Sequence, residues 1–464
     1  MINLKNAFII SQEKNIELYK SYINPGLSRA YSILGYNNFE IVEASGSWLK
    51  LKNKEKILDL TSSLGVVNLG HNNKDIIKAE NFFSSKNYID CQKFGVNKLQ
   101  SVLAYNLKTL LNNNLSLSFF GTSGAEANEA GLKLAMAYYK GKRKKFITFS
   151  NSYHGKTLNS LALTNVQDFQ DSFVLGLDKK NIINLKFNDV ISLEKIITKD
   201  HININAIVIE PIQGQTMEVA SPSFMKKIDE LCRKYKILLF IDEIKCGLSR
   251  GRDIFYYKKF GVKADILTIS KSLGGGKNAI SAMICDDKIF KKAYGSISRS
   301  NIHTTTFFGM GKSCATAIKT LEILSDKKFQ NELNEKTIII EKKFKSLREK
   351  YPKFISSIKG DGLFIGIEIN LNNFIPFQLK NKINNSVNSI IMASIIRYLL
   401  EKYHLLLHFE KTNPSIIKFM PSLNINKKDI NFFFKNFDHF LHSSKKKIFL
   451  NFIYKNIKNI NQLF

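Results

Sequence analysis

The sequence predicts an α/β protein: a large domain built on a mostly parallel central sheet, with a smaller α/β C-terminal domain. The main observation is a set of short apolar runs rich in β-branched residues, which is typical of strands buried on both faces of a parallel sheet. The runs are Lys145–Phe149, Ala206–Ile209, Ile237–Ile241 and Ile266–Ile269. Helical periodicity between two of these runs indicates a strand–helix–strand crossover.

The crossover helix is expected between Ser223 and Tyr235. Met225, Ile228 and Leu231 recur on one helical face, which identifies the side that packs on the sheet. Serine before such a run is a favoured N-cap, so Ser223 is expected to begin the helix.

A chain of 464 residues is longer than a single hydrophobic core usually supports, so we expect two domains. Longer amphipathic helices begin near Ser313, and Leu363–Ile369 is predicted as a strand of the second domain. The expected parts are an N-terminal segment packing on the small domain (1–65), a large cofactor-binding domain (66–312), a small C-terminal domain (313–442) and a basic tail (443–464).

Composition argues against several classes of protein. No apolar stretch approaches the roughly 20 residues that span a bilayer, and the N-terminus lacks a signal peptide, so we expect a cytoplasmic protein with no membrane partner. The five cysteines are scattered and never form a C-x-x-C pair, which argues against disulfides and against a metal site. The net charge of +30 comes from dispersed lysines rather than a basic stripe, so no nucleic-acid partner is expected.

Polar residues follow three of the predicted strands. Glu210 and Asp242 come directly after two of them, and Lys271 comes two residues after the third. Ligands of open α/β sheets bind at the carboxyl ends of the strands, so these side chains are expected to share one pocket. Pyridoxal phosphate needs a carboxylate that keeps its ring nitrogen protonated and a lysine that forms a Schiff base and moves a proton. Asp242 and Lys271 suit these roles, although singly each is also an ordinary turn residue.

A phosphate site is predicted where an apolar strand meets an alanine-rich helix. Ser123, Gly124 and Ala125 begin that helix, and free N–H groups together with the helix dipole favour an anion there. The same residues followed by Glu126 also form an ordinary capping box. Tyr153 follows the next strand, where its ring either stacks on a pyridine face or packs at a strand end.

Taken together, these motifs resemble the class III aminotransferases, which have the PLP-dependent transferase fold of type I. The segments that carry the resemblance are TSGAEANEAGLKLA (122–135), SYHGKTL (152–158), VIEPIQG (208–214), IDEIKCGLSRG (241–251), DILTISKSLGGG (265–276) and HTTTFFG (303–309). Within the class, Asn24-Pro25-Gly26 and DLTSSLGVVNLGH (59–71) look most similar to putrescine aminotransferases, followed by acetylornithine and ornithine aminotransferases.

The resemblance implies that pyridoxal 5'-phosphate is the cofactor and that its phosphate binds at residues 123–125. It implies that Tyr153 stacks on the cofactor ring, that Asp242 pairs with the ring nitrogen, and that Lys271 is the Schiff-base lysine. It also implies a homodimer with shared active sites, in which Thr306 completes the phosphate site of the neighbouring subunit.

Four positions depart from the family pattern. Lys245 stands where glutamine usually lies near the phenolic oxygen of the cofactor. The candidate substrate residues are Lys156 and Lys418, which replace arginines, and Gln215, which replaces a glutamate. Lysine cannot grip a carboxylate through two parallel bonds, so these changes favour a substrate without an α-carboxylate. The alternative is that the lysine-biased composition changed these positions without changing the substrate.

We therefore predict a class III PLP-dependent aminotransferase that moves an amino group from a terminal amine to a 2-oxo acid by a ping-pong mechanism. The expected donors are a diamine, an ornithine-like compound or another ω-amino compound. The alternatives are an aminomutase or racemase on the same scaffold, which would need no 2-oxo acid, and a non-catalytic protein of the same fold.

Overall fold

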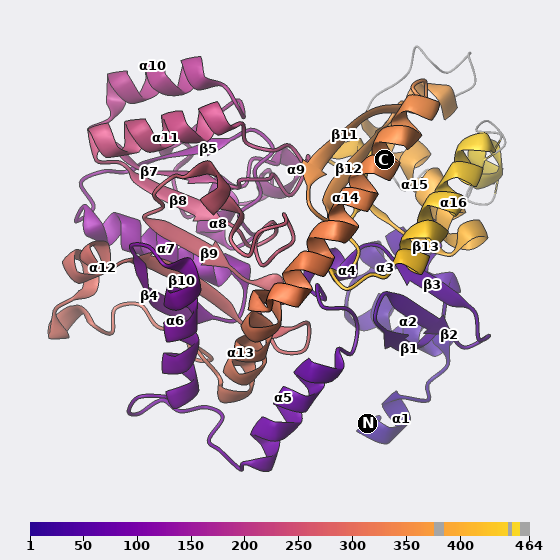
Figure 1. Cartoon of the computed structure of the whole chain (residues 1–464), viewed down its shortest axis with the longest axis horizontal. Helices are drawn as coiled ribbons and strands as arrows, with labels where there is room; N and C mark the ends of the chain where they lie inside the picture. Colours follow the sequence, from indigo (N-terminus) through magenta and orange to yellow (C-terminus); the bar gives the residue numbers. More distant parts are fainter. Residues whose placement is uncertain (375–384, 444–447, 455–464) are drawn as a thin grey trace.

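The computed structural model describes residues 1–374, 385–443 and 448–454, so Lys445–Lys447 of the expected basic tail lie outside the described residues. A seven-stranded sheet and a four-stranded sheet form the centres of a larger and a smaller lobe (Figure 1). A third, four-stranded sheet near the N-terminus lies beside the smaller lobe. Within the described residues, no helix is long and apolar enough to cross a membrane.

The seven-stranded sheet is mostly parallel, as predicted. Its strand order is β4-β10-β9-β8-β7-β5-β6, and only β10 runs antiparallel to its neighbours β4 and β9. The strands are β4 (Leu115–Gly121), β5 (Lys145–Phe149), β6 (Ile182–Leu185), β7 (Ile204–Ile209), β8 (Leu238–Asp242), β9 (Ile266–Ile269) and β10 (Ser281–Asp286). All four strands that the apolar runs predicted are therefore confirmed: β5 and β9 have the predicted bounds, and the ends of β7 and β8 differ by at most two residues.

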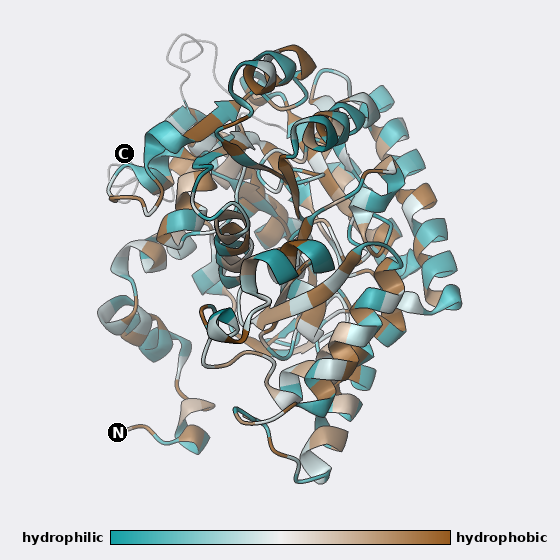
Figure 2. Cartoon of the chain, turned by 90° about the vertical axis from the view of Figure 1, so that its left-hand side faces the viewer, coloured by the Kyte–Doolittle hydropathy of each residue, from teal (hydrophilic) through white to brown (hydrophobic). Residues whose placement is uncertain are grey.

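Helices cover both faces of this sheet because alternate residues of its strands point to opposite sides. Ile207 and Leu239 belong to one buried cluster, which includes the apolar face of α11 (Pro222–Tyr235). Val208 and Phe240, one residue further along each strand, belong to a second cluster with α7 (Gly124–Tyr138). The strands consequently appear hydrophobic between more polar helices in Figure 2.

The crossover helix α11 is confirmed, but its predicted start was wrong. Ser221, not Ser223, is the N-cap, and its Oγ accepts a hydrogen bond from the Phe224 amide at 3.2 Å. Pro222 is the first helical residue, where its missing N–H and fixed φ are well tolerated.

The smaller lobe contains the antiparallel sheet β11-β12-β15-β14, packed with helices of the C-terminal part. The predicted strand at Leu363–Ile369 is confirmed as β12 (Phe364–Ile369). The other elements are β11 (Ile355–Asp361), β14 (His408–Glu410), β15 (Asn413–Phe419), α14 (Lys327–Lys350), α15 (Asn385–Tyr403) and α16 (Lys427–His442). The chain enters this lobe through α13 (Gly311–Ser325), which itself packs on α5 (Lys74–Ser85) and α6 (Lys98–Leu111).

The N-terminal segment is joined to the C-terminal part of the chain. Strands β1 (Ile41–Ser45), β2 (Trp48–Leu51) and β3 (Lys56–Asp59) form a sheet that β13 (Leu405–Leu406) extends in parallel with β3. The indole N–H of Trp48 also donates to Asp429 of α16 at 3.0 Å. Helix α3 (Pro25–Ile33) lies beside this sheet (Figure 1).

Candidate active site

A cavity of about 440 Å³ lies at the carboxyl ends of β5, β7, β8 and β9. Most of the predicted site residues line it: Gly124, Ala125, Tyr153, Lys156, Gln215, Asp242, Lys245 and Lys271. The loops that follow parallel strands meet at one edge of a sheet, so residues distant in sequence converge there.

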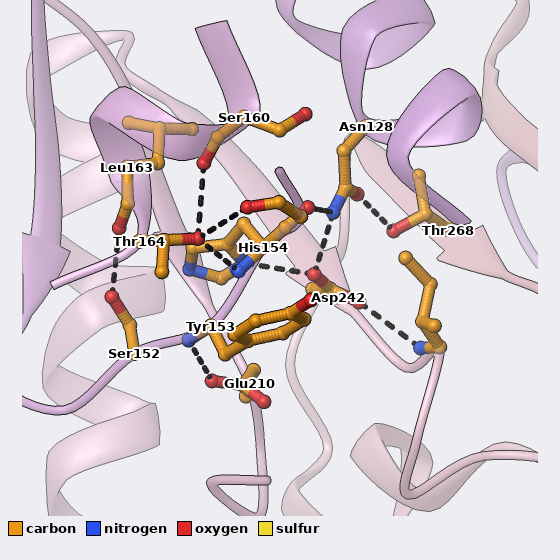
Figure 3. Close-up of polar contacts among 12 residues, drawn as sticks. Asn128, Ser152, Tyr153, His154, Ser160, Leu163, Thr164, Glu210, Asp242 and Thr268 are labelled. Atoms are coloured by element: carbon orange, nitrogen blue, oxygen red, sulfur yellow. Dashed lines mark hydrogen bonds and ion pairs between the residues drawn. The ribbon is translucent and has the colours of Figure 1, made fainter. Parts of the chain in front are cut away.

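Asp242 ends β8 and is held by three donors (Figure 3). Its Oδ2 accepts hydrogen bonds from the Asn128 side chain at 2.8 Å and pairs with His154 Nδ1 at 2.7 Å. Its Oδ1 accepts the Ile244 amide at 3.0 Å. The carboxylate is only 3% exposed, so these contacts fix its orientation toward the cavity.

His154 and Asn128 are held in place by further contacts. Burial opposes a charge on the His154 ring, but the hydrogen bond and charge of Asp242, with Glu210 nearby, raise its pKa. Asn128 donates to the His154 carbonyl at 2.6 Å and accepts from the Thr268 hydroxyl at 2.8 Å (Figure 3). Sequence reasoning missed both residues as supports for Asp242, because only the packed fold brings them together.

Lys271 follows β9 after one intervening residue, Ser270, and has a left-handed backbone with φ 47°. This conformation is costly for a residue with a side chain, so it persists only where neighbours hold it. Ser272 accepts a hydrogen bond from the buried Asn68 side chain at 2.9 Å, and Ser270 donates to the Ile280 carbonyl at 3.3 Å. The residues on both sides of Lys271 are thus anchored to other parts of the fold.

The Lys271 amine is more acidic than an ordinary lysine. Burial is the main cause, and the positive charge of Lys245 adds to it, so the pKa of Lys271 falls from 10.5 to about 8. At pH 7 roughly one Lys271 side chain in ten is then neutral, against about one in three thousand for a free lysine. Only the neutral amine attacks a carbonyl carbon, so the cavity prepares Lys271 as a nucleophile.

We expect the acetylation rate of Lys271 in cofactor-free protein to rise about tenfold per pH unit below pH 8 and to level off above it. Brief labelling with acetic anhydride, followed by mass spectrometry of the peptide, measures this profile against the exposed Lys277. In Lys245→Met the midpoint should rise but stay below 10.5, because burial, the larger cause, remains. If the acetylation profiles of Lys271 and Lys277 had the same midpoint pH, the assignment of Lys271 as the nucleophile would be contradicted.

The N-terminus of α7 offers a place for an anion. Glu126 accepts the amides of Thr122 at 2.6 Å and Ser123 at 2.8 Å, and Ser123 Oγ accepts the Glu126 amide at 3.3 Å. The amides of Gly124 and Ala125 in the first helical turn are left for another acceptor. A Cβ on Gly124 would lie 2.9 Å from the Ile244 side chain, so glycine keeps this corner of the cavity open.

Tyr153 and Glu210 form one wall of the cavity. The Tyr153 ring packs edge-on against Phe169, with centroids 6.2 Å apart, and its backbone amide donates to Glu210 at 2.9 Å. Burial and nearby carboxylates raise the pKa of Tyr153. Burial also raises the pKa of Glu210, whose other oxygen accepts the Gly214 amide at 2.9 Å.

A cluster of two lysines and one carboxylate lies next to this wall and is joined to it through Gly214. Lys245 Nζ donates to the Gly214 carbonyl at 2.9 Å, and the buried Lys418 Nζ donates to the same oxygen at 2.7 Å. Lys418 also pairs with Glu410 at 2.6 Å, while Lys245 lies 3.9 Å from it. Burial opposes the charge on Glu410, but Lys418 and the neighbouring cations hold its pKa below the usual range.

Three of the predicted site residues do not line the cavity. Ser123 is exposed and caps α7, Thr306 is exposed on a separate loop, and Lys418 lies behind Glu410. Glu410 does line the cavity and was missed, because β14 is a short strand whose sequence has no motif that marks a site.

The other two candidate substrate residues already have partners. Lys156 Nζ lies 4.1 Å from the centre of the Phe169 ring. The Gln215 side-chain oxygen accepts a hydrogen bond from Thr412 at 2.9 Å.

Comparison with known proteins places the chain in a family. The family model "Aminotransferase class-III" matches residues 32–441, so the fold is that of a PLP-dependent transaminase. The chain belongs to the class III aminotransferases, and its cofactor is pyridoxal phosphate. The comparisons confirm the class that the sequence motifs predicted. They do not specifically show the closer resemblance to putrescine aminotransferases.

The similar proteins include an acetylornithine aminotransferase from Methanocaldococcus jannaschii. It is 31% identical over 444 residues, which cover 94% of this chain and 100% of that protein. Among solved structures, an (S)-enantioselective ω-transaminase from Thermomicrobium roseum has a TM-score of 0.80 and 21% identity, covering 93% of this chain and 98% of that one. The ornithine aminotransferase from Toxoplasma gondii has a TM-score of 0.79 and 21% identity, covering 97% and 98%.

Proposed function

We propose that this aminotransferase takes its amino group from a terminal amine and passes it to a 2-oxo acid in two separate half-reactions. The observation that carries the proposal is the charge pattern of the cavity. Lys271 and Asp242 both line the cavity. Its described lining residues include three lysines but no arginine. A donor α-carboxylate therefore lacks the planar, two-bond partner that usually binds it.

The cavity suits pyridoxal phosphate in the chemistry of its donor groups. Lys271 supplies the amine for covalent attachment, Asp242 a carboxylate for the ring nitrogen, and Tyr153 an aromatic face. The amides of Gly124 and Ala125, with the exposed Ser123 hydroxyl beside them, favour the phosphate. Lys245 is proposed to face the phenolic oxygen, where a lysine is a stronger donor than a neutral amide.

The protein's own groups perform the proton transfers. When bound, pyridoxal phosphate accepts the electrons of the bond that breaks at the donor carbon. Lys271, displaced by the incoming amine, is free to take the proton from that carbon and to return it elsewhere, since its lowered pKa allows both roles near neutral pH. Asp242, fixed by Asn128 and His154, holds the proton on the ring nitrogen throughout.

The donor class is tested with the enzyme loaded with pyridoxal phosphate and a panel containing putrescine, ornithine, 4-aminobutyrate and alanine. We expect a terminal amine to give the highest kcat/KM with pyruvate or 2-oxoglutarate as acceptor. Without acceptor, one equivalent of carbonyl product per active site should form and then stop, as in a ping-pong reaction. Continued conversion of the donor into an isomeric amine without a 2-oxo acid would instead indicate the aminomutase or racemase alternative.

We further propose that the enzyme is a homodimer in which Thr306 serves the partner's site. The exposed position of Thr306 outside its own cavity supports this. Thr306→Asp and Lys271→Ala should each be nearly inactive, because one repels phosphate and the other lacks the amine. Mixing them, with unfolding and refolding, should restore about a quarter of the wild-type activity, since hybrid dimers contain one intact site. Mixtures that stay inactive would contradict sharing between subunits.

A further inference from the structure

A second cavity, of about 630 Å³, adjoins the catalytic one. It lies between helix α3, the sheet β1–β3 and the segment 400–411, which are neighbours in Figure 1. Leu64 and Glu410 line both cavities, so the two share a wall. The second cavity therefore lies next to the one that contains Lys271. We call the second cavity the apolar chamber.

The chamber walls are mainly aliphatic and aromatic. Ile41, Leu49 and Ile57 contribute from three neighbouring strands, and Leu400 and Leu406 close the space from the C-terminal part. Leu49, Ile57 and Leu400 belong to a small buried cluster that is separate from the main core. Ile41 is still 53% exposed, which leaves apolar surface available to a ligand. Contiguous apolar surface of this kind, next to a catalytic cavity, is typical of a substrate-binding site.

The wall between the cavities is a left-handed turn. Ser62, Ser63 and Leu64 have φ values of 47°, 50° and 59°, and Gly65 continues the turn at 87°. Left-handed backbone is unfavourable for residues other than glycine, and consecutive residues of this kind are rare. Such conformations persist where the surrounding structure holds them, and they concentrate at functional sites.

Specific contacts hold this turn. Asp59 accepts the amides of Thr61 at 2.8 Å and Ser62 at 3.1 Å, and the Ser62 hydroxyl donates to the Met420 carbonyl at 2.8 Å. The turn keeps Leu64 between the cavities with its side chain 41% exposed. A Cβ on Gly65 would lie 3.8 Å from Lys271 Cδ, which shows how close the turn comes to the catalytic amine.

We propose that the apolar chamber binds the apolar remainder of the amine donor, so that the preferred donor is a primary amine with a long alkyl or arylalkyl tail. This inference rests on the proposed function and narrows its donor class. Glu410, the acidic group at the shared wall, already pairs with Lys418 at 2.6 Å and lies 3.9 Å from Lys245. A second ammonium, as in a diamine, would find this carboxylate taken and a lysine charge beside it.

The first test is a series of linear primary amines from three to ten carbons, with pyruvate as acceptor. Each buried methylene should raise kcat/KM about fourfold until the chamber is filled. Octylamine should exceed 1,8-diaminooctane, which has the same length but ends in a charge. A flat series, or a diamine that is the better substrate, would overturn the inference while leaving terminal-amine transamination intact.

A matched pair of variants locates the effect. Ile41 and Val42 are neighbours on β1, 53% and 55% exposed, but only Ile41 lines the chamber. Ile41→Asp should lower kcat/KM for octylamine at least about tenfold and flatten the series, since a carboxylate near the tail must be desolvated. Val42→Asp should keep the wild-type series. Equal losses in both variants would place the tail elsewhere.

A binding measurement separates this inference from the proposed function. Linear alcohols carry no amine and cannot react, so calorimetry of butanol to decanol with the holoenzyme reports the chamber alone. Affinity should rise about fourfold per methylene with a negative heat-capacity change, and Ile41→Asp should remove most of the rise. If the enzyme turned over no terminal amine, the proposed function would be wrong. If the alcohols did not bind, the inference that the chamber binds an apolar tail would be wrong.

Discussion

Lys271→Ala is expected to lower kcat by at least about 10⁴-fold, because the variant loses both the covalent link to the cofactor and the base that moves the proton. The Lys271 amine lies in the catalytic cavity, and neither of the two other lysines described near it is placed to replace it: Lys245 is held by the Gly214 carbonyl and Lys418 by Glu410. Activity is measured as carbonyl product formed from the best donor of the panel.

Three further measurements make this prediction specific to Lys271. Borohydride reduction of the wild-type holoenzyme should leave the cofactor on the peptide that contains Lys271, as mass spectrometry can show. Lys277→Ala, which removes an exposed lysine six residues away, should keep its activity. Added methylamine should restore part of the lost rate in Lys271→Ala, because a small amine can enter the space and carry the proton. Cofactor on another lysine would refute the assignment.

Asp242→Asn is expected to lower kcat on the order of 10²- to 10³-fold, because the amide cannot hold a proton on the ring nitrogen by charge. The fold should also lose stability. Asn128, His154 and the Ile244 amide all contact the carboxylate oxygens, and the new NH₂ group would face one of these donors. A buried donor without an acceptor costs about 1–3 kcal/mol.

Asp429→Asn is the matched control for Asp242→Asn. Asp429 is also a buried aspartate with a side-chain partner, Trp48, but it lies away from the catalytic cavity. It should lose stability with little change in kcat. Reconstituting Asp242→Asn with a cofactor analogue methylated on its ring nitrogen, and therefore permanently cationic, should restore activity. If the analogue brings no recovery, Asp242 has another role.

Local sequence determined the strands and was enough to predict the proposed catalytic pair and the proposed anion site. Buried parallel strands need continuous apolar runs, so β5, β7, β8 and β9 were visible as such runs. Asp242 and Lys271 were predictable because they end or follow strands that the topology brings to one edge. The start of α7 was predictable because capping depends on residues within one turn.

Contacts between distant segments were decided by the tertiary structure alone. Lys418 looked like a substrate residue from its motif, yet Glu410, eight residues earlier on a neighbouring strand, occupies it. His154 and Asn128 meet Asp242 from two other elements. The apolar chamber combines residues near 30–60 with residues near 400–411, whose side chains separately resemble ordinary core residues. Periodicity reports which face of an element is apolar, but whether that face meets another element or borders a cavity depends on how the elements pack.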